Sequence, residues 1–328
     1  MTYRAAVDAI SQATNIVVTT HLNPDGDGIA AALALCYALR LRGKKVRFIS
    51  PSPIPSIYDF LPGVATVTVL EDEAAARRKR PVDLLISCDC GDHARLGACA
   101  ALPARSTLNL DHHASNDRFA AINVVDIHAA STGVVVEKLL RRLGVAMDPS
   151  LAACIYTTLV YDTGRFMHSN TTAAVFRLAA KLLDTGIDAA AINRALTYCK
   201  KPVDLAVQRL GIERLHIDRE QPRLAGIALS AEDIASVGEA VEDWGELVEI
   251  PRTLAGIEVA YLLREQPQAD SVRVSLRSNP PYVVGSIAQA FGGGGHLQAA
   301  GCTINGGLEE AQKALLPQLR QAAAQRGD

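Results

Sequence analysis

Apolar residues recur with two different periods in the first half of the chain. Short, nearly continuous apolar runs predict strands at residues 16–20, 45–49, 66–70, 82–88 and 106–110. Segments with apolar residues at helical spacing predict helices at residues 3–13, 29–41, 131–143, 149–161 and 170–186. Because helices alternate with strands, we expect an α/β domain with a mostly parallel sheet flanked by helices.

The pattern restarts near Pro202, after a mixed helical segment at residues 188–201. Beyond this point the chain predicts strands at residues 224–229, 257–263, 271–277 and 302–304, and helices at residues 204–214, 284–291 and 308–324. We therefore expect a first domain at residues 1–187, a helical linker at residues 188–204 and a smaller α/β domain at residues 205–328.

Composition and charge exclude several classes of protein. Of 328 residues, 49% are apolar, which is enough to fill two cores. A formal net charge of -2 excludes a broadly basic surface that coats nucleic acid, so local groups must hold any anionic ligand. No apolar run approaches the roughly 20 residues of a membrane span, and no apolar leader stands at the N-terminus. We therefore expect a cytoplasmic protein without membrane contact.

The cysteines are interpreted as small buried hydrophobes in a reducing compartment, because their number is odd and no pair has C-x-x-C spacing. They are Cys36, Cys88, Cys90, Cys99, Cys154, Cys199 and Cys302. Cys88 and Cys90 flank Asp89, but neighbouring side chains on a strand point away from one another, so we assign both to packing.

Polar clusters follow three of the predicted strands at their carboxyl ends. The clusters are His21 with Asp25 and Asp27, Asp89 alone, and Asp111 with His112 and His113. Because the carboxyl ends of parallel strands meet at one edge of a sheet, we expect these side chains to lie together. Neighbouring carboxylates repel unless a cation or a proton neutralises them, so the clusters favour a divalent metal. A polar turn that caps a helix would explain one cluster but not three.

Asp162 follows the apolar run of the helix at residues 149–161, so we expect it to be buried or half-buried and to need a partner. A metal, Arg165 or a helix terminus would serve. With Asp162, four carboxylates and two imidazoles are available, which is enough for two ions. Such ligands suit Mn²⁺, Mg²⁺ or Fe²⁺, and a carboxylate that bridges two ions is a common design for displacement at phosphorus.

Two further features carry alternatives. Asp111 can orient a metal-bound imidazole by accepting its other N–H, whereas Arg95 is either a surface cation or a phosphate-binding group. Residues 292–295 are four glycines, followed by His296 and small residues that we expect to begin a helix. Free backbone N–H groups and a helix N-terminus would make an anion-binding cradle there, with a flexible linker as the alternative.

Taken together, these motifs resemble the DHH phosphoesterase family and, within it, the bacterial nanoRNase and pAp phosphatase group. The matching motifs are His21 with Pro24-Asp25-Gly26-Asp27, Asp89 with Arg95-Leu96-Gly97, Asp111-His112-His113 with Asn116, and Asp162-Thr163-Gly164. Residues 292–301, with Arg277 upstream, resemble the signature of the DHH-associated C-terminal domain. The resemblance covers almost the whole chain.

The resemblance implies a role for each of these residues. One metal would be held by His21, Asp25 and Asp89, and the other by Asp27, Asp89, His112 and Asp162. The catalytic residues would be Asp89, Asp111 and His113, with His113 in contact with the scissile phosphate. The substrate-binding residues would be Arg95, Asn116, Arg277, Gly293, Gly294, Gly295 and His296, around an active site in the interdomain cleft.

The activity that the resemblance implies is hydrolysis of short oligoribonucleotides to mononucleotides, removal of the 3′-phosphate of pAp, or both, with Mn²⁺. A cyclic or linear dinucleotide phosphodiesterase, an inorganic polyphosphatase and a non-catalytic dinucleotide sensor remain alternatives. The chain departs from the family at Ala30 and Ala31, where Gly-Ser is usual, and at Val135, where Glu is frequent. No protein partner is indicated, although the apolar helix at 131–143 suits either a homodimer face or a core.

Overall fold

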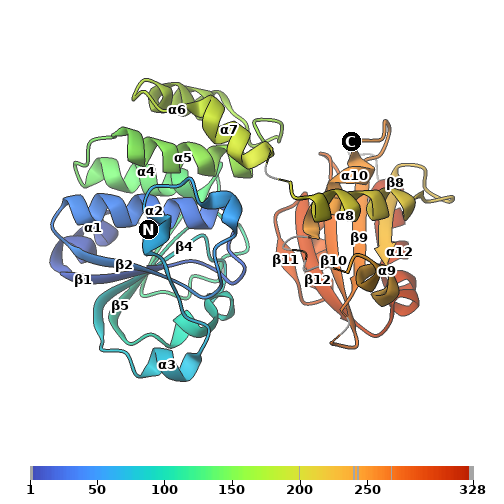
Figure 1. Ribbon diagram of the computed structural model, residues 1–328, viewed down its shortest axis with the longest axis horizontal. Coiled ribbons are helices and arrows are strands. Elements are labelled where there is room, and N and C mark those ends of the chain that lie inside the picture. Colours follow the sequence, from blue (N-terminus) through green and yellow to red (C-terminus); the bar gives the residue numbers. More distant parts are fainter. Residues whose placement is uncertain (1–2, 199, 239–240, 242–243, 267, 325–328) are drawn as a thin grey trace. The chain divides into compact units, whose positions relative to one another are not determined.

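The computed structural model describes residues 3–198, 200–238, 241, 244–266 and 268–324. The chain divides into two compact units, residues 1–199 and residues 200–328. Figure 1 shows the elements of both units, and each unit is considered by itself. The segment predicted as a linker consists of α7 (Ala189–Thr197), which belongs to the first unit, and the start of α8 (Pro202–Glu213), which belongs to the second. The predicted domain bounds themselves stay predictions.

The first unit is built on a six-stranded sheet in which every pair of strands is parallel. Its strands are β1 (Asn15–Thr19), β2 (Lys45–Ser50), β3 (Thr68–Val69), β4 (Val82–Cys88), β5 (Ala104–Asp111) and β6 (Ile122–Val125), in the order β3-β2-β1-β4-β5-β6. The parallel sheet is as predicted from the sequence. The edge strand β6 was not predicted, because a run of four residues is too short to show a period.

Helices cover both faces of this sheet unequally. The helices are α1 (Tyr3–Gln12), α2 (Gly26–Leu41), α3 (Glu73–Arg77), α4 (Thr132–Arg142), α5 (Pro149–Asp162), α6 (Ala173–Leu183) and α7. The larger core packs α1, α2 and α4 against one face, with α5 on the outside of α2 and α4, and a smaller core lies under α3 and the 3₁₀ segment Ala94–Ala101 on the other. Figure 1 shows these helices on opposite sides of the strands.

The family departures lie inside the larger core. Ala30 and Ala31 on α2 and Val135 on α4 are fully buried among apolar side chains. None of the three side chains is therefore exposed to a ligand in solution. The apolar face of α4, with Val136 and Leu139, belongs to the same core, so the residues considered for a homodimer face are core residues.

The second unit is a six-stranded mixed sheet with helices on both faces. Its strands are β7 (Leu215–Ile217), β8 (Leu224–Leu229), β9 (Val259–Glu265), β10 (Ser271–Ser278), β11 (Gly294–Gly295) and β12 (Ala299–Asn305), in the order β11-β12-β10-β9-β8-β7. Only the β8–β9 pair is parallel among these described strands. The helices are α8, α9 (Ala231–Ser236), α10 (Glu249–Arg252), α11 (Gly285–Ala290) and α12 (Leu308–Ala324).

The prediction of a helix after the four glycines is wrong. Residues 299–305 form the strand β12, which pairs with β10 and with the short strand β11. The period is two, because Ala300, Cys302 and Ile304 are buried while their neighbours face outward. Alanine and glycine give little contrast in hydrophobicity, which hid this alternation. The described glycine segment therefore has no helix N-terminus, and any anion held there contacts a β-hairpin.

Two remaining predictions concern membranes and cysteines. None of the helices in the described part of the chain combines the length and apolar character that a membrane crossing needs. Six cysteines are buried and unpaired, as expected for small hydrophobes, and Cys199 lies outside the described residues.

Separate cores predict separate responses to core mutations. We expect Leu315→Ala on α12, which is fully buried in the second unit, to destabilise that unit by about 2–5 kcal/mol. Amide hydrogen exchange measured by mass spectrometry should then accelerate in residues 200–324 and stay unchanged in residues 3–198. The matched variant Leu39→Ala in the first core should show the reverse. Acceleration across both units would contradict two independent cores.

Candidate metal centre and active site

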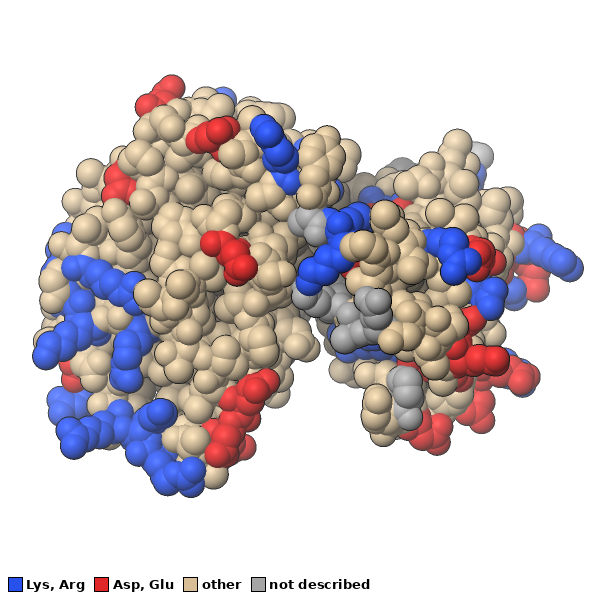
Figure 2. Space-filling model, in the orientation of Figure 1, with Lys and Arg blue, Asp and Glu red and all other residues tan. Residues whose placement is uncertain are grey.

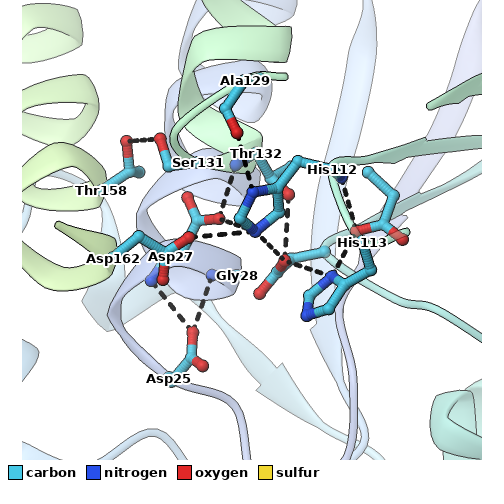
Figure 3. A network of polar contacts seen from close by, with 12 residues as sticks. Asp25, Asp27, Gly28, His112, His113, Ala129, Ser131, Thr132, Thr158 and Asp162 are labelled. Atoms are coloured by element: carbon cyan, nitrogen blue, oxygen red, sulfur yellow. Dashed lines mark hydrogen bonds and ion pairs between the residues drawn. The ribbon is translucent and has the colours of Figure 1, made fainter. Parts of the chain in front are cut away.

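The predicted metal ligands lie together at the carboxyl edge of the first sheet. Figure 3 shows carboxylates and imidazoles from several loops pointing at one another. They follow β1, β4 and β5 and the end of α5, and they are His21, Asp25, Asp27, Asp89, His112 and Asp162. Asp27 is fully buried and Asp89 is 2% exposed, while the side chains of Asp25 and Asp162 are 34% and 16% exposed. The tertiary structure thus assembles the six residues that the sequence singled out.

Their ligand atoms form two groups. In one group, His21 Nε2 lies 3.8 Å from Asp25 Oδ2 and 3.5 Å from Asp89 Oδ2. In the other, His112 Nε2 lies 3.7 Å from Asp27 Oδ2 and 3.0 Å from Asp162 Oδ2. Within each group the ligand atoms lie within 4.8 Å of one another. Oxygen and imidazole donors that converge in this way fit two neighbouring divalent cations.

Asp89 faces both groups with different oxygens. Its Oδ2 points to His21, and its Oδ1 lies 3.7 Å from His112 Nε2. The carboxylate therefore has the orientation that a bridging ligand needs. Its backbone has φ +58°, a left-handed conformation that aspartate tolerates better than most residues, at an order of 1–3 kcal/mol. This turn at the end of β4 directs the side chain between the two groups.

The imidazole of each candidate ligand group is oriented through its second nitrogen. His112 Nδ1 donates to Ala129 O at 3.2 Å, and His21 Nδ1 lies 2.8 Å from Leu22 O. Both contacts turn Nε2 toward the carboxylates, and backbone carbonyls commonly fix metal-binding histidines in this way. Arg95 Nη2 also lies 2.9 Å from His21 Nδ1, so this predicted substrate residue stands at the edge of the site.

The N-terminus of α4 holds two of the carboxylates, which sequence reasoning missed. The backbone N–H groups of Thr132 and Gly133 donate to the two oxygens of Asp27 at 2.6 and 3.0 Å. The Thr132 hydroxyl donates to Asp89 Oδ1 at 3.0 Å. The positive end of a helix stabilises such charges. The sequence signal that could have located this helix N-terminus is Ser131, which caps α4 by accepting from Val134 N at 3.4 Å.

A glycine lets α4 approach its neighbour closely enough for this. A Cβ on Gly133 would lie 1.9 Å from Thr158 Oγ1 on α5. A larger residue would therefore push α4 away from α5 and move the N–H groups that hold Asp27.

Asp25 is both a helix cap and a candidate metal ligand, the two roles that the sequence left open. Its Oδ1 caps α2 by accepting from Asp27 N at 3.0 Å and Gly28 N at 3.2 Å. Its Oδ2 faces His21. Asp25 therefore caps α2 with one oxygen and presents the other oxygen to the candidate metal site.

Asp111 orients the ring of His113. The sequence predicted that Asp111 accepts from an imidazole without deciding which one, and its Oδ1 lies 2.8 Å from His113 Nδ1. His112 is held instead by the Ala129 carbonyl. Asn116 Nδ2 donates to Asp111 Oδ2 and to Cys90 O, so its amide is turned inward. Asp111 and Asn116 therefore fix the ring of His113.

Crowding of these charges shifts their protonation. Burial raises the pKa of Asp27, and the charges of Asp162 and Asp89 raise it further. Burial lowers the pKa of His21, but the hydrogen bonds and charges of Asp25 and Asp89 outweigh this effect and raise it to about 10. Burial raises the pKa of Asp89, yet the hydrogen bond from His21 and the charge of His113 lower it overall. The site therefore holds protons that divalent cations would displace.

The predicted residues of the second unit gather at one end of β10. Arg277 pairs in register with Ala299, next to the hairpin of β11 and β12. Its Nε donates to Glu249 Oε1 at 3.0 Å, and the backbone N–H of the exposed His296 donates to Ala299 O at 2.8 Å. A Cβ on Gly293 would lie 2.1 Å from Gly301 O, whereas one on Gly294 would meet open space. The hairpin thus needs Gly293 for close packing and leaves Gly294 open.

A cluster of basic side chains in the described part of the first unit lies at the opposite edge of the sheet from the candidate metal centre. Figure 2 shows Lys and Arg around α3, while much of the same face carries no charge. The exposed residues Arg77, Arg78, Lys79 and Arg80 precede β4 and so lie at the amino edge of the sheet. This cluster is therefore not placed to contact an anion at the candidate metal centre.

Two family models match this sequence. The model of the DHH family, N-terminal domain, matches residues 15–159, and that of the DHHA1 domain matches residues 224–325. The first range contains every candidate ligand except Asp162, which lies just beyond it.

Characterised relatives resemble the chain along nearly its whole length. A Thermus thermophilus protein named bifunctional oligoribonuclease and PAP phosphatase NrnA is 31% identical over 95% of this chain and 91% of its own. A Bacillus subtilis protein of the same name is 25% identical over 91% of this chain and 92% of its own.

Solved structures share the fold. An exopolyphosphatase-related protein from Bacteroides fragilis has a TM-score of 0.85 at 24% identity and covers 98% of this chain and 96% of its own. RecJ from Thermus thermophilus in complex with Mn²⁺ has a TM-score of 0.56 at 14% identity, over 99% of this chain and 55% of RecJ.

Removing the Thr132 hydroxyl tests how Asp89 is positioned. We expect Thr132→Val to weaken divalent metal binding roughly 10- to 100-fold, because one oxygen of Asp89 loses its donor. Thr132→Ser keeps the hydroxyl and should bind within about threefold of the native protein. Calorimetric titration of Mn²⁺ measures both affinities. Equal affinity of the Val variant and the native protein would contradict this role.

Metal binding should release protons. The raised pKa of His21, about 10, means that this imidazole is protonated at pH 7 without metal, and the charge of Asp162 likewise raises the pKa of His112 against the effect of burial. Only neutral imidazoles and ionised carboxylates bind metal, so we expect a net release of protons and tighter binding as pH rises. Calorimetry in buffers of different ionisation enthalpy counts the protons. His21→Asn should remove one of them, and an unchanged count would oppose this assignment.

Proposed function

The chain belongs to the DHH family of phosphoesterases, and we propose that it hydrolyses short oligoribonucleotides to mononucleotides and removes the 3′-phosphate of pAp with two Mn²⁺ ions. The observation that carries this proposal is the pair of ligand groups with Asp89 between them. The relative with 31% identity, whose name includes both activities, supports the choice of substrates.

The two groups suggest how the ions are shared. His21, Asp25 and Asp89 would hold one ion. The other would be held by Asp89 together with Asp27, His112 and Asp162. Divalent cations at such a pair of sites neutralise phosphate charge and lower the pKa of water. Mg²⁺ and Fe²⁺ also suit these donors, so the choice of Mn²⁺ belongs to the proposal.

His113 is the residue of this chain that we expect to act on the scissile phosphate. Burial lowers its pKa, but the hydrogen bond to Asp111 and the charge of Asp89 outweigh burial and raise it. The ring therefore retains a proton on Nδ1, where Asp111 accepts it. The contact with a phosphate or leaving oxygen then falls to Nε2. As an imidazolium, His113 would stabilise negative charge that develops there.

The remaining residues bear on substrate binding. Arg277, His296 and residues 293–295 would hold the far end of the substrate, through a guanidinium and the open backbone of the hairpin. Arg95 beside His21 would contact a phosphate near the metals. Asn116 holds Asp111, so we propose that it acts by positioning His113. The buried, unpaired cysteines support a cytoplasmic location.

A substrate panel tests the proposal directly. The panel contains pAp, a 5′-phosphorylated RNA dinucleotide, a five-nucleotide RNA, a cyclic dinucleotide and tripolyphosphate, each with Mn²⁺. We expect fast turnover of the dinucleotide or pAp, loss of turnover with a chelator and recovery when Mn²⁺ is returned. Asp89→Ala should remove activity, because both ions lose a ligand.

The exposed residue Asp59 provides a matched control. Asp59→Ala removes an exposed carboxylate of the same unit that belongs to neither candidate ligand group, and it should leave turnover unchanged. Tight dinucleotide binding without turnover of any substrate would refute the enzyme and leave a sensor. Preferred turnover of tripolyphosphate would refute the nucleotide substrates.

A further inference from the structure

Among the described residues, the outward positions of β10 and β12 on one face of the second sheet contribute nothing to either apolar core of this unit. On β10, Val272, Val274 and Leu276 point into the core beside α12. The second unit has another apolar core on the opposite face of the sheet, under α8 and α10. Among the described residues, this core contains residues of β8 and β9 but none from β10 or β12. The alternate positions of β10, which are Arg273, Ser275 and Arg277, therefore face outward beside β12.

The outward positions of β10 and β12 form an uncovered strip. This strip is basic at Arg273 and carries small residues along β12. Arg273 is exposed, and its Nη1 donates to Thr303 Oγ1 at 3.3 Å. The residues of β12 that pair with these positions of β10 are small, and Gly301 lies opposite Ser275. A Cβ on Gly301 would lie 3.8 Å from Arg273 Nη2, so the guanidinium extends over the glycine. None of the ion pairs among described side chains involves Arg273, whereas Arg277 is paired with Glu249 at 3.0 Å.

The spacing of these side chains suits a nucleic acid strand. Residues i and i+2 of an antiparallel strand lie about 7 Å apart on one face. A nucleotide contributes six backbone bonds where a residue contributes three, so one extended nucleotide covers about the same 7 Å as two residues. Arg277, Ser275 and Arg273 thus present a hydrogen-bond donor at each nucleotide repeat. Arginine is well suited to phosphate, because its guanidinium makes two parallel hydrogen bonds.

We propose that β10 is a track for the backbone of single-stranded RNA, in which Arg277 binds one phosphate and Arg273 binds a phosphate about two nucleotides away. This inference rests on the proposed function, because it takes Arg277 as a substrate contact. A dinucleotide held at Arg277 is too short to use Arg273 fully. The track therefore favours substrates of three or more nucleotides and sets a preference by chain length.

The test compares two RNA lengths in the full-length protein. We expect Arg273→Ala to raise the KM of a five-nucleotide RNA roughly three- to tenfold more than the KM of a dinucleotide. The dependence of log affinity on log salt for the longer RNA should become shallower by about 0.7, which is the value for one phosphate contact on a single strand. Arg273→Lys keeps the charge and should restore most of this salt dependence.

Arg219 is the matched control, because it is an exposed arginine in the turn after β7, at the opposite edge of the same sheet. Arg219→Ala should leave the ratio of the two KM values as in the native protein. An equal effect of Arg273→Ala on both lengths, or none on either, would overturn the track. Fluorescence anisotropy of labelled RNA in the presence of a chelator measures binding without turnover. Absent turnover with length-dependent binding would refute the proposed function and retain the track.

Discussion

Mutual repulsion among buried carboxylates is the constraint on which this site depends. Asp27, Asp89 and Asp162 approach one another at the carboxyl edge of a parallel sheet, where burial already disfavours their charge. The protein offsets this cost in two ways. The N-terminus of α4 holds Asp27, while His21 and His112 face the other carboxylates. The negative charge that these contacts do not offset makes the cluster suited to divalent cations.

The rigid surroundings of the cluster follow from close helix packing. α2 is buried almost all round, and its alanines bring it against α4 and α5 in the larger core. Gly133 allows α4 to lie near Thr158 and so delivers the N–H groups to Asp27. Ala30, Ala31 and Val135, where the sequence was expected to depart from the family, lie in this core. None of the three belongs to either candidate ligand group.

The second unit contributes a different kind of surface. Its hairpin and β10 offer backbone groups and arginines on a sheet face instead of a helix terminus. The predicted helix directly after the four glycines is replaced in the structure by the first residues of β12, which continue into the strand predicted at residues 302–304. A strand places alternate side chains on one face at a nucleotide-like spacing, which a helix would not do. The correction removes the helix N-terminus from the expected anion cradle and places the small residues of β12 beside the arginines of β10.

The sequence by itself determined the alternation of strands and helices in the first unit and the six candidate ligands, because strand ends and buried runs are local patterns. It did not reveal that Thr132 and Gly133 hold Asp27, since these partners are 105 and 106 positions apart and share no periodicity. It also could not decide between His112 and His113 as the partner of Asp111, because adjacent residues after a strand have no fixed direction. Those choices belong to the tertiary structure, since only packing brings distant backbone N–H groups and carboxylates to one point.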